Sequence, residues 1–267
     1  MLVKAVRLTG VQRLVRHLRY SGDQKDLDGN LKGKVAWITG AGSGIGKSLA
    51  QHWATLGVKL VLTDIDEESL TKFDDHLKRH YFCQEGGVSE GDILLLPGDI
   101  TDVSHHDKWL KEILNKFGKL DILVNNAGRM SQGSLMMPMS AQKSQFEVNV
   151  FSHVALTQAV LPYFLEQKQG HIVAVSSLLA LLPLSKLAPY SASKATILLI
   201  FVHIFPYNLV QSYFTSLRAE LWRHNIPVTV LCPGPVGTRL LARTPEPEEK
   251  AGDKVCAFTS VVQLYIL

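Results

Sequence analysis

The stretch KVAWITGAGSGIGKS, residues 34–48, decides the fold. It passes from a continuous apolar run into a glycine-rich turn and then into residues that favour a helix. An apolar run without polar alternation is typical of a strand that is buried on both faces of a sheet. Strand, tight turn and helix in this order form the first unit of a parallel sheet whose strands are joined by crossover helices.

The same alternation continues along the chain and predicts a complete α/β domain. Further strands are expected over 59–64, 92–99, 120–128, 170–177 and 227–234, with helices over 44–57, 67–80, 103–118 and 140–167. Right-handed crossovers then give a doubly wound parallel sheet, a Rossmann fold, with helices on both faces. The predicted organisation is a basic leader over 1–33, one domain over 34–238 and a shortened tail over 239–267.

The positive charge of the chain is concentrated in the leader. The formal net charge is +4, and the first twenty residues hold five basic and no acidic side chains. The body is therefore close to neutral, which argues against a nucleic-acid-binding face. Apolar residues of the leader recur at roughly helical spacing, so it is either a targeting or membrane-surface helix or a frayed basic terminus. We expect a cytoplasmic location or the periphery of an organelle membrane, and the leader's composition favours the mitochondrion.

The glycine-rich turn, TGAGSGIG at 39–46, is a candidate dinucleotide site. Gly40 permits a tight turn, and Gly44 and Gly46 allow the backbone and the following helix to approach each other closely. The N-terminus of that helix presents free N–H groups and a partial positive charge, which suit a pyrophosphate. An ordinary loop is the alternative, and the flanking strand and helix favour the nucleotide site.

Two aspartates follow the next two strands and suggest which nucleotide is bound. Asp64 ends the second strand, where its carboxylate would accept a hydrogen bond from a ribose 2′-hydroxyl and repel a 2′-phosphate. This favours NAD, with NADP still possible. Alternatively Asp64 caps the next helix, a task that Asp66 could serve equally well. Asp99 is placed to meet the adenine amino group, or else it is only a turn residue.

Tyr190 and Lys194 stand four residues apart, a spacing that suits proton transfer on a helix. A free phenol has a pKa near ~10, so a nearby ammonium group is expected to favour the phenolate. Ser177 ends the fifth strand and can hold a substrate oxygen as charge develops on it. Asn149 lies inside a predicted helix, where asparagine is unfavourable, so either it has a polar task or it faces solvent. Its expected task is to anchor a water.

Together these motifs resemble the short-chain dehydrogenase/reductase family, most of all its dehydrogenase/reductase member 7 group. The resemblance covers about 34–238 and rests on TGAGSGIG, Asp99, NNAG at 125–128, Asn149, Ser177, the pair Tyr190 and Lys194, and PGPVGT at 233–238. It implies a nicotinamide-dependent oxidoreductase acting on an alcohol or carbonyl, with a lipophilic, steroid- or retinoid-like substrate. It also implies association with the endoplasmic reticulum membrane and assembly into homodimers or tetramers.

The resemblance also implies a set of site residues and no metal. The expected catalytic residues are Asn149, Ser177, Tyr190 and Lys194. The expected cofactor-binding residues are Gly40, Ser43, Gly44, Ile45, Gly46, Asp64, Asp99, Asn126, Tyr190, Lys194, Pro233, Gly234 and Thr238.

The chain departs from the family pattern in two places. The apolar block ILLIFVHIFPYNL, 197–209, interrupts the helix that follows Lys194, and its removal would join SASKAT directly to VQSYFTSL. Pro206 removes a helical hydrogen bond, so we expect a break near 206–208 and a disturbed subunit interface. The tail after Thr238 reads as a polar loop followed by a short helix or strand. These departures raise an alternative function, a splice-type isoform that binds cofactor or partner subunits without efficient turnover.

Overall fold

The computed structural model describes residues 31–81, 89–131, 137–198, 217, 220–221, 224–234 and 265–266. The leader, apart from 31–33, lies outside these ranges. Outside them as well are positions 199–209 of the apolar block, the predicted break near Pro206 and most of the tail. The structure therefore describes most of residues 34–234, whereas the predicted domain limits stay predictions.

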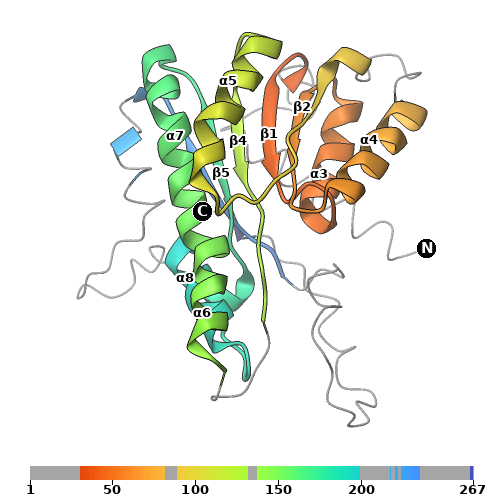
Figure 1. Cartoon of the computed structure of the whole chain (residues 1–267). Helices are drawn as coiled ribbons and strands as arrows, with labels where there is room; N and C mark the ends of the chain where they lie inside the picture. The colour runs from red at the N-terminus through yellow and green to blue at the C-terminus, as the bar shows by residue number, and fades with distance from the viewer. Residues whose placement is uncertain are drawn as a thin grey trace.

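Within the described residues the strands form one sheet in the order β3-β2-β1-β4-β5-β6-β7 (Figure 1). The pairs from β3 to β6 are parallel, so the predicted doubly wound sheet is confirmed. The strands are β1 (Val35–Thr39), β2 (Lys59–Thr63), β3 (Ile93–Leu95), β4 (Ile122–Asn125), β5 (His171–Val175), β6 (Val228–Cys232) and β7 (Tyr265–Ile266). β7 pairs antiparallel with the end of β6, which bears out a strand rather than a helix at this point of the tail.

Helices cover both faces of the sheet because successive strand residues point in opposite directions. Ala36 and Ile38 pack against α3 (Gly44–Thr55) and α4 (Glu67–Tyr81), whereas Val35 and Trp37 pack on the other face. The helices of that second face are α5 (His106–Phe117), α7 (Ser152–Gln167) and α8 (Ala188–Leu198) (Figure 1). Two hydrophobic cores thus hold the sheet between them.

The helix predicted over 140–167 is not uniform. It consists of α6 (Met139–Phe146), a π-helical turn η3 (Glu147–Phe151) and α7. Within the described residues this stretch, Met139–Gln167, is also the one helix long and apolar enough to cross a membrane. Because α7 packs on the sheet through buried Leu156, Val160 and Phe164, we assign this hydrophobicity to the core.

The third strand is shorter than predicted. β3 ends at Leu95, although the backbone continues beside β2 through hydrogen bonds from Leu96 N to Leu62 O and from Gly98 N to Asp64 O. Proline at 97 has no N–H to donate, and Gly98 has a φ of 154°, so regular pairing stops here.

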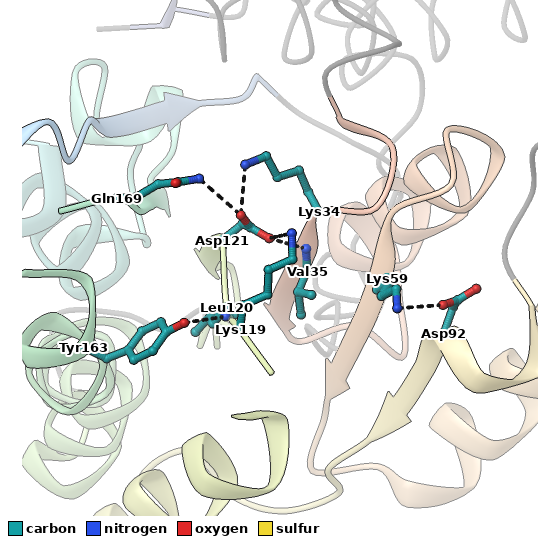
Figure 2. A network of polar contacts seen from close by, with 9 residues as sticks. All are labelled: Lys34, Val35, Lys59, Asp92, Lys119, Leu120, Asp121, Tyr163 and Gln169. Carbon is teal, nitrogen blue, oxygen red and sulfur yellow. Dashed lines mark hydrogen bonds and ion pairs between the residues drawn. The ribbon is translucent and has the colours of Figure 1, made fainter. Parts of the chain in front are cut away.

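A buried carboxylate fastens the edge of the sheet where the parallel strands begin (Figure 2). Asp121, just before β4, accepts hydrogen bonds from Val35 N at 2.8 Å and from Lys34 Nζ at 2.9 Å. Lys119 Nζ lies 3.0 Å from Asp121 Oδ2, the oxygen that also accepts from Val35 N. Burial acts to raise the pKa of Asp121, but these donors outweigh it and hold the pKa below its ordinary value. This network joins β1 to β4 at the end of the sheet opposite the candidate site.

Candidate functional site

The candidate site lies at the carboxyl ends of β1, β4, β5 and β6, around the point where the strand order reverses between β1 and β4. The turn after β1 requires glycine at two positions. Gly40 has a φ of 66°, and a Cβ there would lie 2.8 Å from Ala127 Cα. A Cβ on Gly46 would collide with the carbonyl oxygen of Gly40. The turn is therefore packed tightly against the end of β4 and the start of α3.

The N-terminus of α3 fits a dinucleotide pyrophosphate. Ser43 is its N-cap but makes no side-chain capping hydrogen bond, and the first turn holds no acidic residue. The first N–H groups of the helix are thus not capped by this side chain, and no carboxylate of that turn would repel a phosphate. Gly44 has a φ of 54°, and Ile45 packs against the core, which fixes the direction of the helix. The cofactor-binding prediction for these residues is compatible with this geometry.

Thr39, the last residue of β1, joins the glycine-rich turn to the end of β4. Its Oγ1 accepts hydrogen bonds from Asn126 N at 3.0 Å and Ala127 N at 3.1 Å. The Asn126 side chain donates from Nδ2 to Thr39 O at 2.8 Å and to Gly40 O at 3.2 Å. Asn126 therefore shapes the turn from behind. The role of Thr39 was not predicted, since a threonine at a strand end is unremarkable in sequence.

The structure separates the tasks of Asp64 and Asp66. Asp64 Oδ2 accepts a hydrogen bond from Gly42 N at 2.9 Å, so this carboxylate lies against the glycine-rich turn. Asp66 accepts from Ser69 N at 3.0 Å in the first turn of α4. The capping alternative thus belongs to Asp66. Asp64 keeps unused acceptor capacity beside the turn, because a carboxylate can accept about four hydrogen bonds.

Asp99 forms a local turn. Its Oδ1 accepts hydrogen bonds from Thr101 N and Thr101 Oγ1, both at 2.9 Å. This is the turn geometry that the sequence offered as the alternative to contact with adenine. The adenine contact stays a prediction, because the second carboxylate oxygen takes no part in these two bonds.

Ser177, Tyr190 and Lys194 are buried together beyond β5. These three residues are 8%, 5% and 3% exposed, respectively. Lys194 Nζ donates to Val175 O at 2.8 Å, and Ser177 Oγ accepts from Leu179 N at 3.1 Å. The Ser177 hydroxyl lies near enough to Tyr190 to act on the pKa of its phenol. Both Tyr190 and Lys194 lie within α8, so the predicted helical spacing is confirmed up to Leu198.

The electrostatics of this group differ from the sequence expectation. Burial raises the pKa of Tyr190, and the nearby Ser177 hydroxyl acts in the opposite direction without cancelling it. Burial lowers the pKa of Lys194 to about 8. The prediction that Lys194 makes the phenol more acidic is therefore wrong for the protein by itself. The reason is that loss of water penalises both charged forms, while the ammonium group is directed to the Val175 carbonyl.

Asn149 lies in η3 and is fully buried, which excludes the solvent-facing alternative. Its Oδ1 accepts from Arg129 N at 2.7 Å, and its Nδ2 donates to Arg129 O and to Ser193 Oγ, each at 2.9 Å. Ser193 in turn donates to Tyr190 O at 2.8 Å. Asn149 thus connects the segment after β4 to the helix that carries Tyr190. Its predicted water contact stays a prediction.

The remaining predicted residues follow β6. Pro233 O accepts a hydrogen bond from Leu178 N at 2.9 Å, so this end of β6 lies directly beside the residue after Ser177. Gly234 is buried, and Thr238 lies outside the described residues. Gly128 is near the centre of the site, because a Cβ on it would lie 3.4 Å from Lys194 Nζ and 3.5 Å from Asn149 Oδ1. The structure thus brings the predicted residues of β1, β4, β5, β6 and α8 to one edge of the sheet.

Comparisons with known proteins agree with this arrangement. The short chain dehydrogenase family pattern matches residues 34–249. The human protein named dehydrogenase/reductase SDR family member 7 is 37% identical over 254 residues, which are 90% of this chain and 69% of the relative. Its mouse counterpart is also 37% identical, over 84% of this chain and 64% of its own length. The chain thus spans about two thirds of these relatives.

A solved structure supports the same placement. The 3-ketoacyl-(acyl-carrier-protein) reductase of Brucella melitensis, complexed with NADH, is 30% identical and superposes with a TM-score of 0.68. The match covers 80% of each chain. The family match and the structural match both cover the domain that holds the glycine-rich turn after β1 and the buried group beyond β5. The chain therefore belongs to the short-chain dehydrogenase family of nicotinamide-dependent oxidoreductases.

Proposed function

We propose that this chain transfers a hydride between a nicotinamide cofactor and an alcohol or carbonyl substrate, with Tyr190 as the proton donor or acceptor. One observation carries the proposal. Ser177, Tyr190 and Lys194 are buried together at the same edge of the sheet as a glycine-rich turn that has no space for a Cβ at Gly40. Proton transfer and dinucleotide binding are thus served from adjacent strand ends.

The proposed proton transfer uses the phenol of Tyr190. A bound nicotinamide would supply or accept the hydride. In carbonyl reduction the Tyr190 hydroxyl donates its proton to the substrate oxygen, and in alcohol oxidation it takes the proton back. Ser177, whose hydroxyl lies beside Tyr190, orients the same oxygen and stabilises its developing charge. Because burial raises the pKa of Tyr190, the protein by itself favours the protonated phenol, the form that reduction requires.

Lys194 is proposed to hold the nicotinamide ribose. With a pKa of about 8 it is mainly charged at neutral pH, although it is buried. Its present acceptor is the Val175 carbonyl, which leaves two of the three ammonium hydrogens for other acceptors. Its Nζ lies close to Gly128, so this charge is beside the segment that follows β4.

NAD is the proposed cofactor rather than NADP. Asp64 lies against the glycine-rich turn through Gly42, where a negative charge would repel a 2′-phosphate. The related reductase of Brucella melitensis was solved with NADH. These observations support NAD and leave NADP as the competitor that a direct binding measurement would distinguish.

A lipophilic substrate, steroid- or retinoid-like, is the proposed substrate class. The residues that follow Ser177 read LLALLPL, and Leu181, Leu182 and Leu184 are exposed. Exposed leucines next to a buried polar group favour a ligand that presents one oxygen and a large apolar surface. Contact of the leader with a membrane surface stays a prediction, since the leader is almost entirely outside the described residues, and assembly into homodimers or tetramers stays a prediction as well.

The experiment compares Tyr190→Phe with Tyr163→Phe in the purified full-length chain. The Tyr163 hydroxyl also makes a hydrogen bond, accepting from Leu120 N at 3.4 Å, but it lies at the opposite end of the sheet (Figure 2). Turnover of lipophilic carbonyls should fall about 10²- to 10⁴-fold in Tyr190→Phe and stay near wild type in Tyr163→Phe. NADH binding, followed by its fluorescence, should be nearly unchanged in both. Full turnover in Tyr190→Phe would show that another group transfers the proton.

A further inference from the structure

Four fully buried polar side chains on one long helix bind four alternate residues of the segment that leaves β4. Gln145 Oε1 accepts from Ser131 N at 2.7 Å, and Asn149 binds both backbone groups of Arg129. His153 Nε2 lies 2.7 Å from Ala127 O, and Thr157 Oγ1 accepts from Asn125 Nδ2 at 2.9 Å. We call these four contacts the polar ladder. Figure 1 shows the segment running beside α7 and α6.

The spacing of the polar ladder is regular on both sides. Its helical members are four residues apart, and their partners are two residues apart in the opposite direction along the chain. Four helical residues rise about 6 Å, and two extended residues span about 6.6 Å, so the two repeats nearly match. An extended segment can therefore meet the helix at each of these positions without stretching.

The π-helical turn η3 keeps the ladder in line. At 100° per residue, twelve residues of α-helix from 145 to 157 would rotate the last side chain about 120° away from the first. A π turn accommodates one extra residue, which reduces this rotation to about 20°. Ser152 N donates to Glu147 O, as a π turn requires, and Ser152 Oγ donates to Val148 O at 2.7 Å. The helix is thus built to present all four side chains to one segment.

The segment held by the polar ladder forms a wall of the candidate site. Ala127 packs against Gly40 of the glycine-rich turn, where an added Cβ would approach it to 2.8 Å. Gly128, the next residue, is close to both Lys194 and Asn149, since a Cβ on it would lie 3.4 Å from Lys194 Nζ and 3.5 Å from Asn149 Oδ1. A displacement of this segment would therefore move both the turn that fits the pyrophosphate and the surroundings of Lys194.

We propose that Gln145, His153 and Thr157 are positioning residues that, together with Asn149, hold residues 125–131 in place as one wall of the dinucleotide site. This inference rests on the proposed function for its effect on cofactor binding, but not for the contacts themselves. His153 is the central test, because a carbonyl can only accept and its Nε2 must therefore carry the proton. Nδ1 then has no partner among the described residues.

His153 acts in its neutral form. Burial, followed by the charge of Lys194, lowers its pKa to about 3. The bond to Ala127 O is thus that of a neutral donor over the pH range in which the protein would be assayed. A glutamine can reach a similar point with its Nε2 donor, whereas a leucine of similar size cannot donate.

The experiment uses the full-length chain and the variants His153→Leu, His153→Gln and His171→Leu. His171 is the matched control, since its ring makes a hydrogen bond to Thr229 at 2.9 Å and burial lowers its pKa to about 4, away from the site. Two quantities are measured, the hydrogen-exchange rate of the Arg129 amide and the Kd for NADH. The acceptor of that amide, on Asn149, is unchanged in all three variants.

In His153→Leu the Arg129 amide should exchange about tenfold faster, and the NADH Kd should rise about tenfold. His153→Gln should restore both to within about threefold, and His171→Leu should change neither. An unchanged exchange rate or an unchanged NADH Kd in folded His153→Leu overturns the positioning role. If His153→Leu does not fold, Gln145→Met, which removes the acceptor of Ser131 N, makes the same test from the other end of the ladder.

The two proposals fail in different ways. If the wild-type chain binds no NADH, the proposed function is wrong, and the Arg129 exchange rate alone then decides whether the polar ladder holds the segment. If the wild type binds NADH and His153→Leu binds it equally well, the proposed function stands and the positioning role is wrong.

Discussion

Replacing Gly40 by alanine tests whether the glycine-rich turn is shaped by its contact with the end of β4. Alanine at this position meets two penalties. The first is its φ of 66°, which disfavours any residue with a Cβ by about 1–2 kcal/mol. The second is steric, since the new Cβ would lie 2.8 Å from Ala127 Cα and 3.1 Å from Ala127 N. Ordinary van der Waals contact begins at 3.4 Å, so the turn or the segment must move.

Gly118→Ala isolates the first penalty. Gly118 ends α5 with a φ of 72°, and nothing lies within 4 Å of a Cβ placed on it. Its replacement should lower the free energy of unfolding by about 1–2 kcal/mol and leave the site untouched. Gly40→Ala should lower it by a further 1–3 kcal/mol, roughly, which is the usual effect of forcing a group into a packed position.

The assay combines chemical denaturation with NADH titration on wild type, Gly118→Ala and Gly40→Ala. The Kd for NADH should rise at least about tenfold in Gly40→Ala, because the displaced backbone is the part that would face the pyrophosphate. It should be unchanged in Gly118→Ala. Equal losses of stability in the two variants, with NADH binding intact in both, would refute the steric argument and with it the placement of the cofactor against this turn.

Three further predictions concern charged groups. The donors around Asp121 outweigh its burial and hold its pKa below the ordinary value, so its stabilising effect is complete above the unfolded pKa of about 3.9 and is lost as pH falls through the lower folded value. Denaturation should accordingly show Asp121→Asn about 1–3 kcal/mol less stable than wild type at pH 7, a difference that shrinks below about pH 4. Asp64→Ala should narrow the preference for NADH over NADPH in competitive binding, and tighter binding of NADPH by the wild type would contradict the assignment of Asp64. Because the pKa of Lys194 is about 8, NADH affinity should weaken between pH 7 and 9.5 in the wild type and be weak and flat in Lys194→Met.

The sheet could be predicted from the sequence because its strands are buried on both faces. Each strand then reads as an apolar run, and the residues at its carboxyl end fall together at one edge of the sheet. This is why Gly40, Ser177 and Pro233 could be assigned to one site although they are far apart in sequence. The end of β3 was misjudged because Pro97 and Gly98 keep the chain beside β2 without regular pairing.

The state of Tyr190 could not be predicted from its distance to Lys194. Four residues on a helix bring two side chains near each other, but the pKa of each depends on how much water surrounds it. Both are buried here, so the pKa of the phenol is raised, which favours its protonated form, and the pKa of the ammonium group is lowered. The phenolate that alcohol oxidation needs would have to form with substrate and cofactor in place, and not through the pair of residues by itself.

The polar ladder shows a different limit of sequence reasoning. Gln145, Asn149, His153 and Thr157 recur every four residues along the helix, and in a regular α-helix the last side chain would point about 120° away from the first. In a regular α-helix these four side chains would therefore not all face one partner. The composition of the sequence does not reveal the π turn that brings them into line. Its hydrogen bonds are made by Ser152, an ordinary residue in the sequence, which donates from N to Glu147 O and from Oγ to Val148 O. Their common function becomes visible once an extended segment is seen beside the helix with a matching two-residue repeat. It follows that a substitution shifting η3 back to α-helical pairing would misalign the ladder without removing any of its side chains.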